Sequence, residues 1–305
     1  MKKFNGKLLF SAIVAVFTLV VAGPISVLAA TSPTLGAVGS YSVLGHTTVT
    51  NTGPTTMPGD LGISIGGAPT GFPPGSVGPP GTVRNAGDSL AAQTADTAAF
   101  LALSAAPNAT CDITYADSPH ELTGATLTPG IYCANAFQLT GTLYLDDLGD
   151  SNAVWIFRSA STLNTSAGVG ASVQLTAGSD DEILGSPCNV WWKVVSSATI
   201  GSGTTFIGNI LALTSIDLGT GASLNGRALA QTGAVTLHNN TFTGSSCLTT
   251  STFTGGGSVT GVTPKLPNTG SGSEQNTASL WAIGISSGII VALLSFIFVQ
   301  RKRVI

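Results

Sequence analysis

An internal repeat of 18 residues constrains the fold of this chain most strongly. When residues 197–243 are laid over themselves with an 18-residue shift, Phe206 falls on Leu224 and then on Phe242. A fixed period with apolar residues in register is typical of a coil that stacks on itself. Within each period apolar and polar residues alternate, and Gly and Asn interrupt them, which predicts short strands joined by corners.

Eighteen residues divide into three sides of about six residues, which is a typical strand length. The sequence therefore predicts an all-β fold, a parallel β-solenoid of roughly triangular section. Its coils are expected to lie about 4.8 Å apart, the usual spacing of neighbouring strands.

Alternation along a strand predicts which side chains point outward. The inward positions of Phe206, Leu224 and Phe242 place a hydroxyl residue outward on each coil: Thr205, Ser223 and Thr241. Segments of similar pattern upstream, where the coils are expected to begin near Leu122, add Thr142 and Ser172 to this row. A second side carries an outward row with Thr199, but Asp217 interrupts its neutral surface.

On the remaining side, Leu211 and Leu229 point outward, and exposed leucine rows need a cover. The alanine-rich stretch 86–106, which Pro107 stops, is the helical segment expected in the domain. We expect this helix to cover the leucine side through a stripe of small residues: Ala91, Ala95, Ala98 and Ala102. Trp155, Trp191 and Trp192 are expected in the core or at its corners.

The N-terminus has the pattern of a secretory signal peptide over residues 1–30. Three lysines precede an uncharged apolar run from Leu8 to Val21, and small residues end the segment at Ala29 and Ala30. A retained membrane anchor is the alternative, but a run of this length is too short to span a bilayer comfortably. We therefore expect the protein to be exported.

The C-terminus combines three elements in a fixed order: the pentapeptide LPNTG, an uncharged segment over 278–299 and a basic tail. The pentapeptide consists of Leu266, Pro267, Asn268, Thr269 and Gly270. The segment 278–299 is long enough for one membrane helix, and the basic tail favours a cytoplasmic end. The arrangement over 266–305 resembles the sorting signal of Gram-positive sortase substrates. That resemblance implies transient membrane anchoring, sortase cleavage after Thr269 and covalent attachment to cell-wall peptidoglycan. A permanent one-pass membrane protein is the alternative.

Between these ends the sequence predicts one domain, about 31–248, and a Gly/Ser/Thr-rich linker over 249–265. The basic residues of the domain are only Arg84, Arg158, Lys193 and Arg227, which argues against a nucleic-acid partner because such sites need clustered cations. Charged residues make up 8% of the whole chain, so hydroxyls are the candidates for keeping its surface soluble.

Four cysteines in an exported domain predict disulfides. Three pairings are possible, and we favour Cys111 with Cys133 and Cys188 with Cys247, since the second would tie the last coil to an earlier one. No cysteine or histidine spacing suggests a metal site. Acidic loops could hold calcium, but we interpret them as solvated turns. We find no nucleophile, phosphate-binding or cofactor motif in a suitable context, and expect no enzymatic activity and no cofactor.

Several motifs in order resemble the widespread microbial ice-binding protein family known as DUF3494. They are NTGPTTMPGDLG, TLTPGIYC, GTTFIGNILALTSI and LNGRALAQTGAVTL, and the resemblance covers about residues 33–247. It implies a right-handed β-solenoid with a helix alongside and one flat face that adsorbs to ice.

Family members often carry Thr-Ala/Gly-x-Thr/Asn on that face. Residues 52–55 and 123–126 match this motif literally, 202–205 and 220–223 match when serine is allowed, and 238–241 departs from it. The predicted ice-binding residues are therefore Thr142, Ser172, Ser202, Thr205, Thr220, Ser223 and Thr241. The competing hypothesis is a surface adhesin or structural module that binds a polysaccharide or another surface protein. A flat face without Trp or Tyr favours ice.

Overall fold

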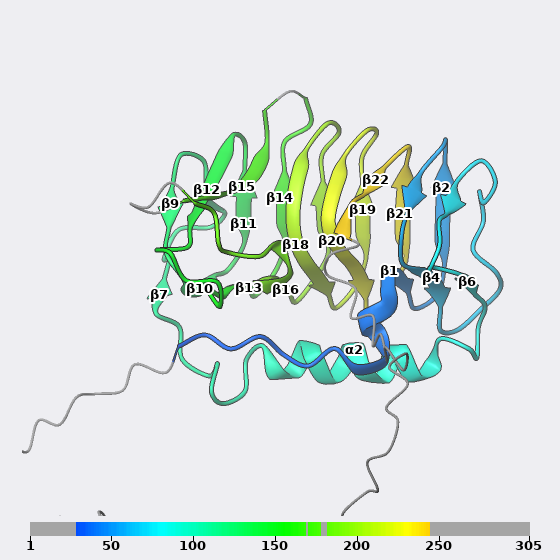
Figure 1. Ribbon diagram of the computed structural model, residues 1–305, viewed down its shortest axis with the longest axis horizontal. Coiled ribbons are helices and arrows are strands. Elements are labelled where there is room, and N and C mark those ends of the chain that lie inside the picture. Colours follow the sequence, from blue (N-terminus) through cyan, green and yellow to red (C-terminus); the bar gives the residue numbers. More distant parts are fainter. Residues whose placement is uncertain (1–28, 169, 178–181, 245–305) are drawn as a thin grey trace, which may run out of the picture. The chain divides into compact units, whose positions relative to one another are not determined.

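The computed structural model describes residues 29–168, 170–177 and 182–244. These residues form a parallel β-solenoid with one α-helix along its side (Figure 1). The fold class predicted from the sequence is therefore confirmed. The predicted signal peptide up to residue 28, the linker, the LPNTG segment and the apolar span 278–299 lie outside the described residues. No helix within the described ranges is long and apolar enough to cross a membrane.

Each coil of the solenoid contributes to three faces. The first, which we call the helix face, is built from the C-terminal halves of two long strands, β18 (Thr205–Ala212) and β20 (Ser223–Ala230), and from shorter strands. The shorter strands are β1 (Tyr41–Gly45), β4 (Asp60–Ile63), β6 (Val83–Arg84), β7 (Ile113–Thr114), β10 (Gly130–Ala134), β13 (Trp155–Ser159) and β16 (Val190–Val194).

The second face, which we call the hydroxyl face, contains the N-terminal ends of β18 and β20. It also contains β3 (Thr56–Met57), β5 (Ser76–Val77), β9 (Thr126–Leu127), β12 (Thr142–Asp146), β15 (Ser172–Thr176) and β22 (Thr241–Phe242).

The third face is a separate sheet of seven strands. Its members are β2 (Val49–Thr52), β8 (His120–Glu121), β11 (Phe137–Leu139), β14 (Leu163–Thr165), β17 (Ala198–Ile200), β19 (Ile216–Leu218) and β21 (Val235–His238).

The predicted 18-residue period is the register of the central coils. Phe206 pairs with Leu224 and Leu224 with Phe242, while Ile200 pairs with Leu218 on the third face. Farther upstream the period lengthens, since Thr142 pairs with Ser172 and Ser172 with Thr205. The extra residues lie in the connections β12–β13 and β15–β16. The second of these carries the short 3-10 helix η2 (Pro187–Asn189).

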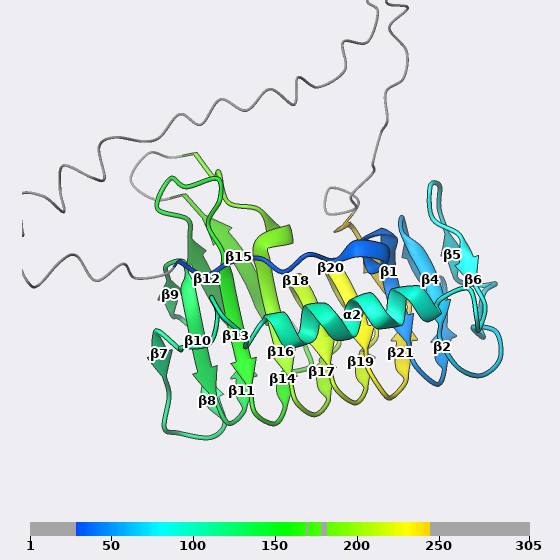
Figure 2. The same ribbon diagram turned by 90° about the horizontal axis from the view of Figure 1, so that it is seen from below.

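The N-terminal strands stack on the last coil and do not precede the first. β1 pairs with β20, β2 with β21 and β3 with β22, so residues 41–57 form the coil that follows residue 242 in space. The chain then returns along the solenoid as the helix α2 (Leu90–Ala102) and begins β7 at the opposite end, as Figures 1 and 2 show. The short 3-10 helix η1 (Gly36–Ser40) lies beside α2.

The helix covers the leucine side as predicted, but it is shorter than expected and only part of the predicted alanine stripe faces the solenoid. Leu211 and Leu229 are buried in one cluster with Ala92, Ala99 and Phe100. Of the predicted stripe, Ala91 and Ala98 are exposed, whereas Ala95 and Ala102 are half-buried and Ala95 packs against this cluster. The helix begins only after Gly87, whose φ of +94° is not helical, and its last turn ends before Pro107. The docking face therefore combines alanines with larger side chains, namely Gln93, Asp96 and Phe100.

The core inside the coils contains a column of stacked aromatic rings. Tyr132, Phe157, Trp192 and Phe206 follow one another with ring centroids 5.4, 4.0 and 4.9 Å apart. Trp155 and Trp192 are fully buried in the core, and Trp191 is buried on the helix side. The predicted core placement of the tryptophans is therefore confirmed.

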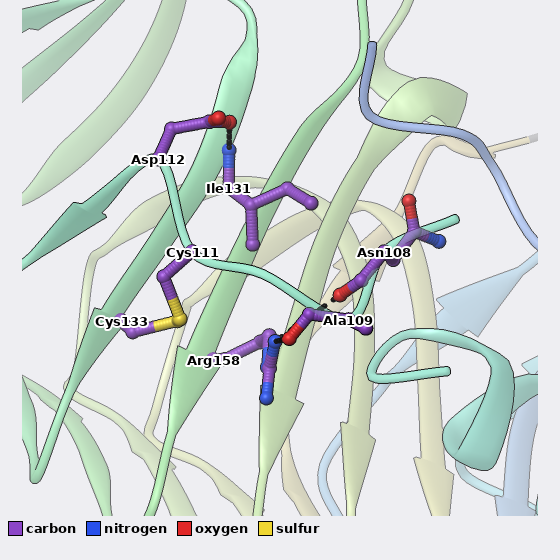
Figure 3. The surroundings of a disulfide bond; sticks show 7 residues. All are labelled: Asn108, Ala109, Cys111, Asp112, Ile131, Cys133 and Arg158. Carbon is purple, nitrogen blue, oxygen red and sulfur yellow. Dashed lines mark hydrogen bonds between the residues drawn. A yellow bond between two sulfur atoms is a disulfide. The ribbon is translucent and has the colours of Figure 1, made fainter. Parts of the chain in front are cut away.

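One of the two predicted disulfides is described by the structure. Cys111 and Cys133 are joined, with their Cα atoms 6.0 Å apart (Figure 3). The pairing of Cys188 with Cys247 stays a prediction because Cys247 lies outside the described residues.

Candidate functional site

A left-handed corner joins the third face to the hydroxyl face in every central coil. Gly203 and Gly221 have φ of 71° and 72°, and the equivalent Asn239 has φ of 53°. Glycine adopts this conformation without steric cost, and asparagine tolerates it better than most residues. The Thr-Gly-x-Thr-like motifs are therefore corner sequences. The second residue turns the chain, the third points inward and the fourth begins the next face.

A second bend separates the hydroxyl face from the helix face within the long strands β18 and β20. Gly208 and Gly226 lie at this bend, with φ of 107° and 156°. A Cβ atom at Gly226 would lie 1.9 Å from the backbone oxygen of Gly208. The coils can therefore stack here only because neither residue has a side chain.

The hydroxyl face carries one hydroxyl residue in a single register line on each of its strands except β9, where Thr126 pairs with Tyr144 outside the line. Tyr144 of β12 is 37% exposed on this face, so the expectation that the face lacks Tyr is wrong. The line runs through Thr142, Ser172, Thr205, Ser223, Thr241, Thr56 and Ser76. Thr205 and Thr241 are exposed and Ser223 is half-buried. The predicted row thus exists as a line of neighbouring residues, and we call it the hydroxyl row.

The end of the hydroxyl row at β12 and β15 is less open than its centre. Thr142 and Ser172 share a hydrogen bond of 3.0 Å between their hydroxyl oxygens. Ser172 also accepts a bond of 3.2 Å from Nε2 of Gln174 and is only 8% exposed. These two predicted residues therefore contribute less free hydroxyl surface than Thr205 and Thr241.

Ser202 and Thr220, the other two predicted residues, lie at the corner and not in the row. Each comes directly before a left-handed glycine, at the border between the third face and the hydroxyl face. Thr220 is exposed and Ser202 is half-buried. The corner line therefore runs beside the hydroxyl row.

Sequence reasoning missed Thr56 and Ser76, the two members of the row from the N-terminal coils. Both are exposed, and Thr56 pairs with Thr241. The literal motif at residues 52–55 pointed to Thr55 instead, but Thr55 is fully buried and donates a hydrogen bond to Asn51. An alignment of residues 52–57 with 238–242 that allows one extra residue is the signal that identifies Thr56.

The third face presents its own outward line of polar residues. The line runs through Glu121, Gln138, Asn164, Thr199, Asp217, Thr236 and Thr50. The Asp217 side chain is 53% exposed, and its carboxylate lies 3.9 Å from Nε2 of His238. This line is as regular as the hydroxyl row, but it carries carboxylates.

The described residues include no group of three or more His, Cys, Asp or Glu side chains that could hold a metal ion. The polar side chains gathered on the outer faces are mainly hydroxyls and amides in lines. Such surfaces suit adsorption to an extended, repeating partner better than the enclosure of a small molecule, for which concave pockets are typical.

Comparison with known proteins gives a consistent result. The family described as "Ice-binding-like" matches residues 43–243. An ice-binding protein of Nostoc sp. (strain HG1) is 46% identical over 217 residues, which cover 70% of this chain and 74% of the relative.

Solved structures of ice-binding proteins share the fold. One from an Antarctic biological consortium has a TM-score of 0.63 at 37% identity, and the match covers 72% of this chain and 94% of the other. One from the Antarctic ascomycete Antarctomyces psychrotrophicus has a TM-score of 0.61 at 34% identity, covering 69% and 97%. With its solenoid, its covering helix and these relatives, the chain belongs to the ice-binding-like family.

Proposed function

We propose that this protein adsorbs to ice through the hydroxyl row and the corner line beside it. The observation that carries the proposal is the single register line of seven hydroxyl residues on seven successive strands. Successive members repeat at the strand spacing of about 4.8 Å. The proteins with similar sequences and folds are named for ice binding, which supports the same conclusion.

The physical basis of the proposal is order that exists before binding. The backbone ladders and the buried aromatic column fix the positions of the outward hydroxyls and methyls, so little conformational entropy is lost when they contact a crystal. Water held at these positions would repeat with the coils and join the ice lattice. The row itself contains no charged side chain, so ordered water next to it is not drawn into an ionic hydration shell.

The third face is a second candidate surface for the same function. Its seven strands form one continuous ladder, and Thr199, Thr236 and Thr50 lie outward in it. The observation against it is the pair of carboxylates, Glu121 and Asp217, in its outward line. We therefore place the hydroxyl row first and test both faces in one experiment.

The function is tested by ice-affinity partitioning of residues 31–265. The protein should concentrate in slowly grown ice while albumin stays in the liquid. Exclusion from ice to the same degree as albumin would overturn the proposal and favour the competing hypothesis of an adhesin or structural module.

The face is tested by two matched substitutions on exposed strand residues. Thr205→Tyr places a bulky ring at the centre of the hydroxyl row, and Thr199→Tyr does the same on the third face. We expect Thr205→Tyr, and likewise Ser223→Tyr, to lose most ice shaping, while Thr199→Tyr keeps it. For the exposed Thr205 and Thr199, stability should change by no more than about 0.5 kcal/mol. The opposite pattern would assign adsorption to the third face.

We also propose that the protein is exported and attached covalently to a Gram-positive cell wall through Leu266, Pro267, Asn268, Thr269 and Gly270. The order of pentapeptide, apolar segment and basic tail supports this. Thr269→Ala should leave the protein in the membrane fraction or the medium. Wall material that still carries the variant after boiling in detergent would contradict the sortase mechanism.

A further inference from the structure

Two positive side chains lie next to each other on the helix face, away from the hydroxyl row. Arg158 of β13 and Lys193 of β16 are register partners on neighbouring strands. The described residues contain only two other lysine or arginine residues, Arg84 and Arg227. Half of the basic side chains of an otherwise acidic domain are therefore concentrated at one point.

Neither cation has a carboxylate partner among the described residues. Lys193 Nζ donates to the hydroxyl of Ser104 and lies 4.3 Å from the ring centroid of Phe100. Arg158 Nη1 donates to the backbone oxygens of Asn108 and Ala109, each at 3.1 Å (Figure 3). The ion pairs formed within the described ranges involve other residues. Both cations are thus held by neutral groups alone.

The two side chains line a hollow of about 320 Å³. Its walls include Ser104, just beyond the end of α2, and the disulfide Cys111–Cys133. Figure 3 shows the disulfide joining the segment 108–111 to β10, with Arg158 reaching the backbone of the same segment. The covalent bond therefore fixes the wall that orients the guanidinium group.

Burying the charges of Lys193 and Arg158 without a counter-ion is unfavourable. Lys193 is only 7% exposed, and the pKa of its ammonium falls to about 8, first because burial removes water and second because Arg158 repels it. The groups that face it from the helix side are Ser104 and Phe100, which bring no charge. An ammonium has three N–H donors, and one of them is occupied by Ser104.

We propose that this hollow binds a small tetrahedral oxyanion, such as phosphate or sulfate. Such an anion would accept the free N–H donors of Lys193 and Arg158 and would neutralise the repulsion between them. Charge-assisted bonds of this kind to arginine and lysine are the usual means of oxyanion recognition. The site is separate from the hydroxyl row, so occupancy and ice adsorption can be measured independently.

In the test, the full chain carries an isotope label at Cε of its lysine side chains. It is titrated with sodium phosphate and, in a separate series, with sodium sulfate, while chloride keeps the ionic strength constant. Two charge-assisted contacts correspond to half-saturation at about 1 mM. The Lys193 resonance should shift with a saturating curve, and its pKa should rise by about one unit or more because the bound anion stabilises the ammonium.

Anion binding by the variants is followed by isothermal titration calorimetry, because Lys193→Met removes the reporting resonance. This variant keeps the aliphatic stem against Phe100 and removes the charge, and it should weaken anion binding at least about tenfold. Arg84→Met is the matched control, since it removes one positive charge at β6, toward the opposite end of the solenoid (Figure 1). It should leave binding unchanged. If the Lys193 shift saturates with both phosphate and sulfate, the hollow is a general oxyanion site. If it saturates with only one of them, the hollow is an oxyanion site selective for that anion.

Three results would overturn the proposal: a Lys193 resonance that does not saturate with either anion, equal weakening in Lys193→Met and Arg84→Met, or unchanged binding in Lys193→Met. The Lys193 titration of the parent protein needs no variant, so the proposal remains testable if a substitution impairs folding.

Discussion

Asp96 lies fully buried between the helix and the solenoid, and it should make the stability of the protein fall as pH rises. Its Oδ2 accepts one long hydrogen bond of 3.4 Å from Nε2 of Gln93, and its Oδ1 has no hydrogen-bond partner among the described residues. Burial therefore raises the pKa of the Asp96 carboxyl from 3.8 to about 8, because the single bond from Gln93 offsets only part of the lost hydration.

The direction of the effect follows from proton binding. In the unfolded chain the carboxyl loses its proton near pH 3.8, whereas in the folded protein it keeps the proton until about pH 8. Between these values the folded state binds more protons, so the free energy of unfolding decreases with rising pH. Each pH unit corresponds to about 1.4 kcal/mol. About three units separate 3.8 from neutral pH, so Asp96 costs up to about 4 kcal/mol at pH 7.

Asparagine has nearly the same shape as aspartate and carries no charge. Asp96→Asn should therefore raise the free energy of unfolding by up to about 4 kcal/mol at pH 7, with the gain shrinking to about 0.6 kcal/mol near pH 4. Urea unfolding followed by circular dichroism at pH 4, 5.5, 7 and 8 measures this difference. Glu182→Gln, at an exposed position, is the control and should change stability by about 0.5 kcal/mol or less at every pH. If parent and Asp96→Asn differ by the same amount at pH 4 and pH 7, the reasoning is wrong.

Three further variants test how the helix and the coils are held. Leu229→Tyr, buried under α2, should lower the free energy of unfolding by about 1–3 kcal/mol through overpacking, with ice shaping kept in the folded fraction. Arg227→Met should cost about 3 kcal/mol in urea unfolding, since the buried guanidinium donates 2.7 Å bonds to Asn209 Oδ1 and Gly39 O that methionine cannot replace. Replacing Cys111 and Cys133 together by serine should cost about 3 kcal/mol, given their separation of 22 residues, and an unchanged midpoint would contradict this.

The sequence predicted the central coils well because their 18-residue register is a local, periodic signal. Phe206, Leu224 and Phe242 pair as expected, and their outward neighbours form the hydroxyl row. The outer coils were harder to predict. The connections after β12 and β15 interrupt the period, and the stacking of Thr56 on Thr241 joins residues far apart in the chain. A contact of that range leaves no trace in short-range periodicity.

The helix shows a different limit of pattern reasoning. Alanine spacing indicated a packed stripe of four residues: Ala91, Ala95, Ala98 and Ala102. Ala91 and Ala98 are exposed, and the face that docks also contains Gln93, Asp96 and Phe100. Polar residues can occupy a buried helix face when hydrogen bonds receive them, and such partners come from distant strands. Gln93 Oε1 accepts from Ser64, and Gln93 Nε2 donates to the backbone of Ala230 at 3.4 Å. The hydrophobic pattern alone could not identify these contacts.

The two polar features of this molecule follow from one arrangement of the chain. Every coil turns one strand toward the helix and two toward the outside, and three of the buried charged residues, Asp96, Lys193 and Arg227, lie on the helix side. The hydroxyl row is then free to carry short neutral side chains at a constant spacing, whereas the third face keeps the carboxylates of Glu121 and Asp217. A charge placed at Thr205 would disturb the regular water that the proposed adsorption requires, whereas a charge at Lys193 is remote from it. The fold therefore permits an ice-adsorbing face and an oxyanion site to coexist without sharing a residue.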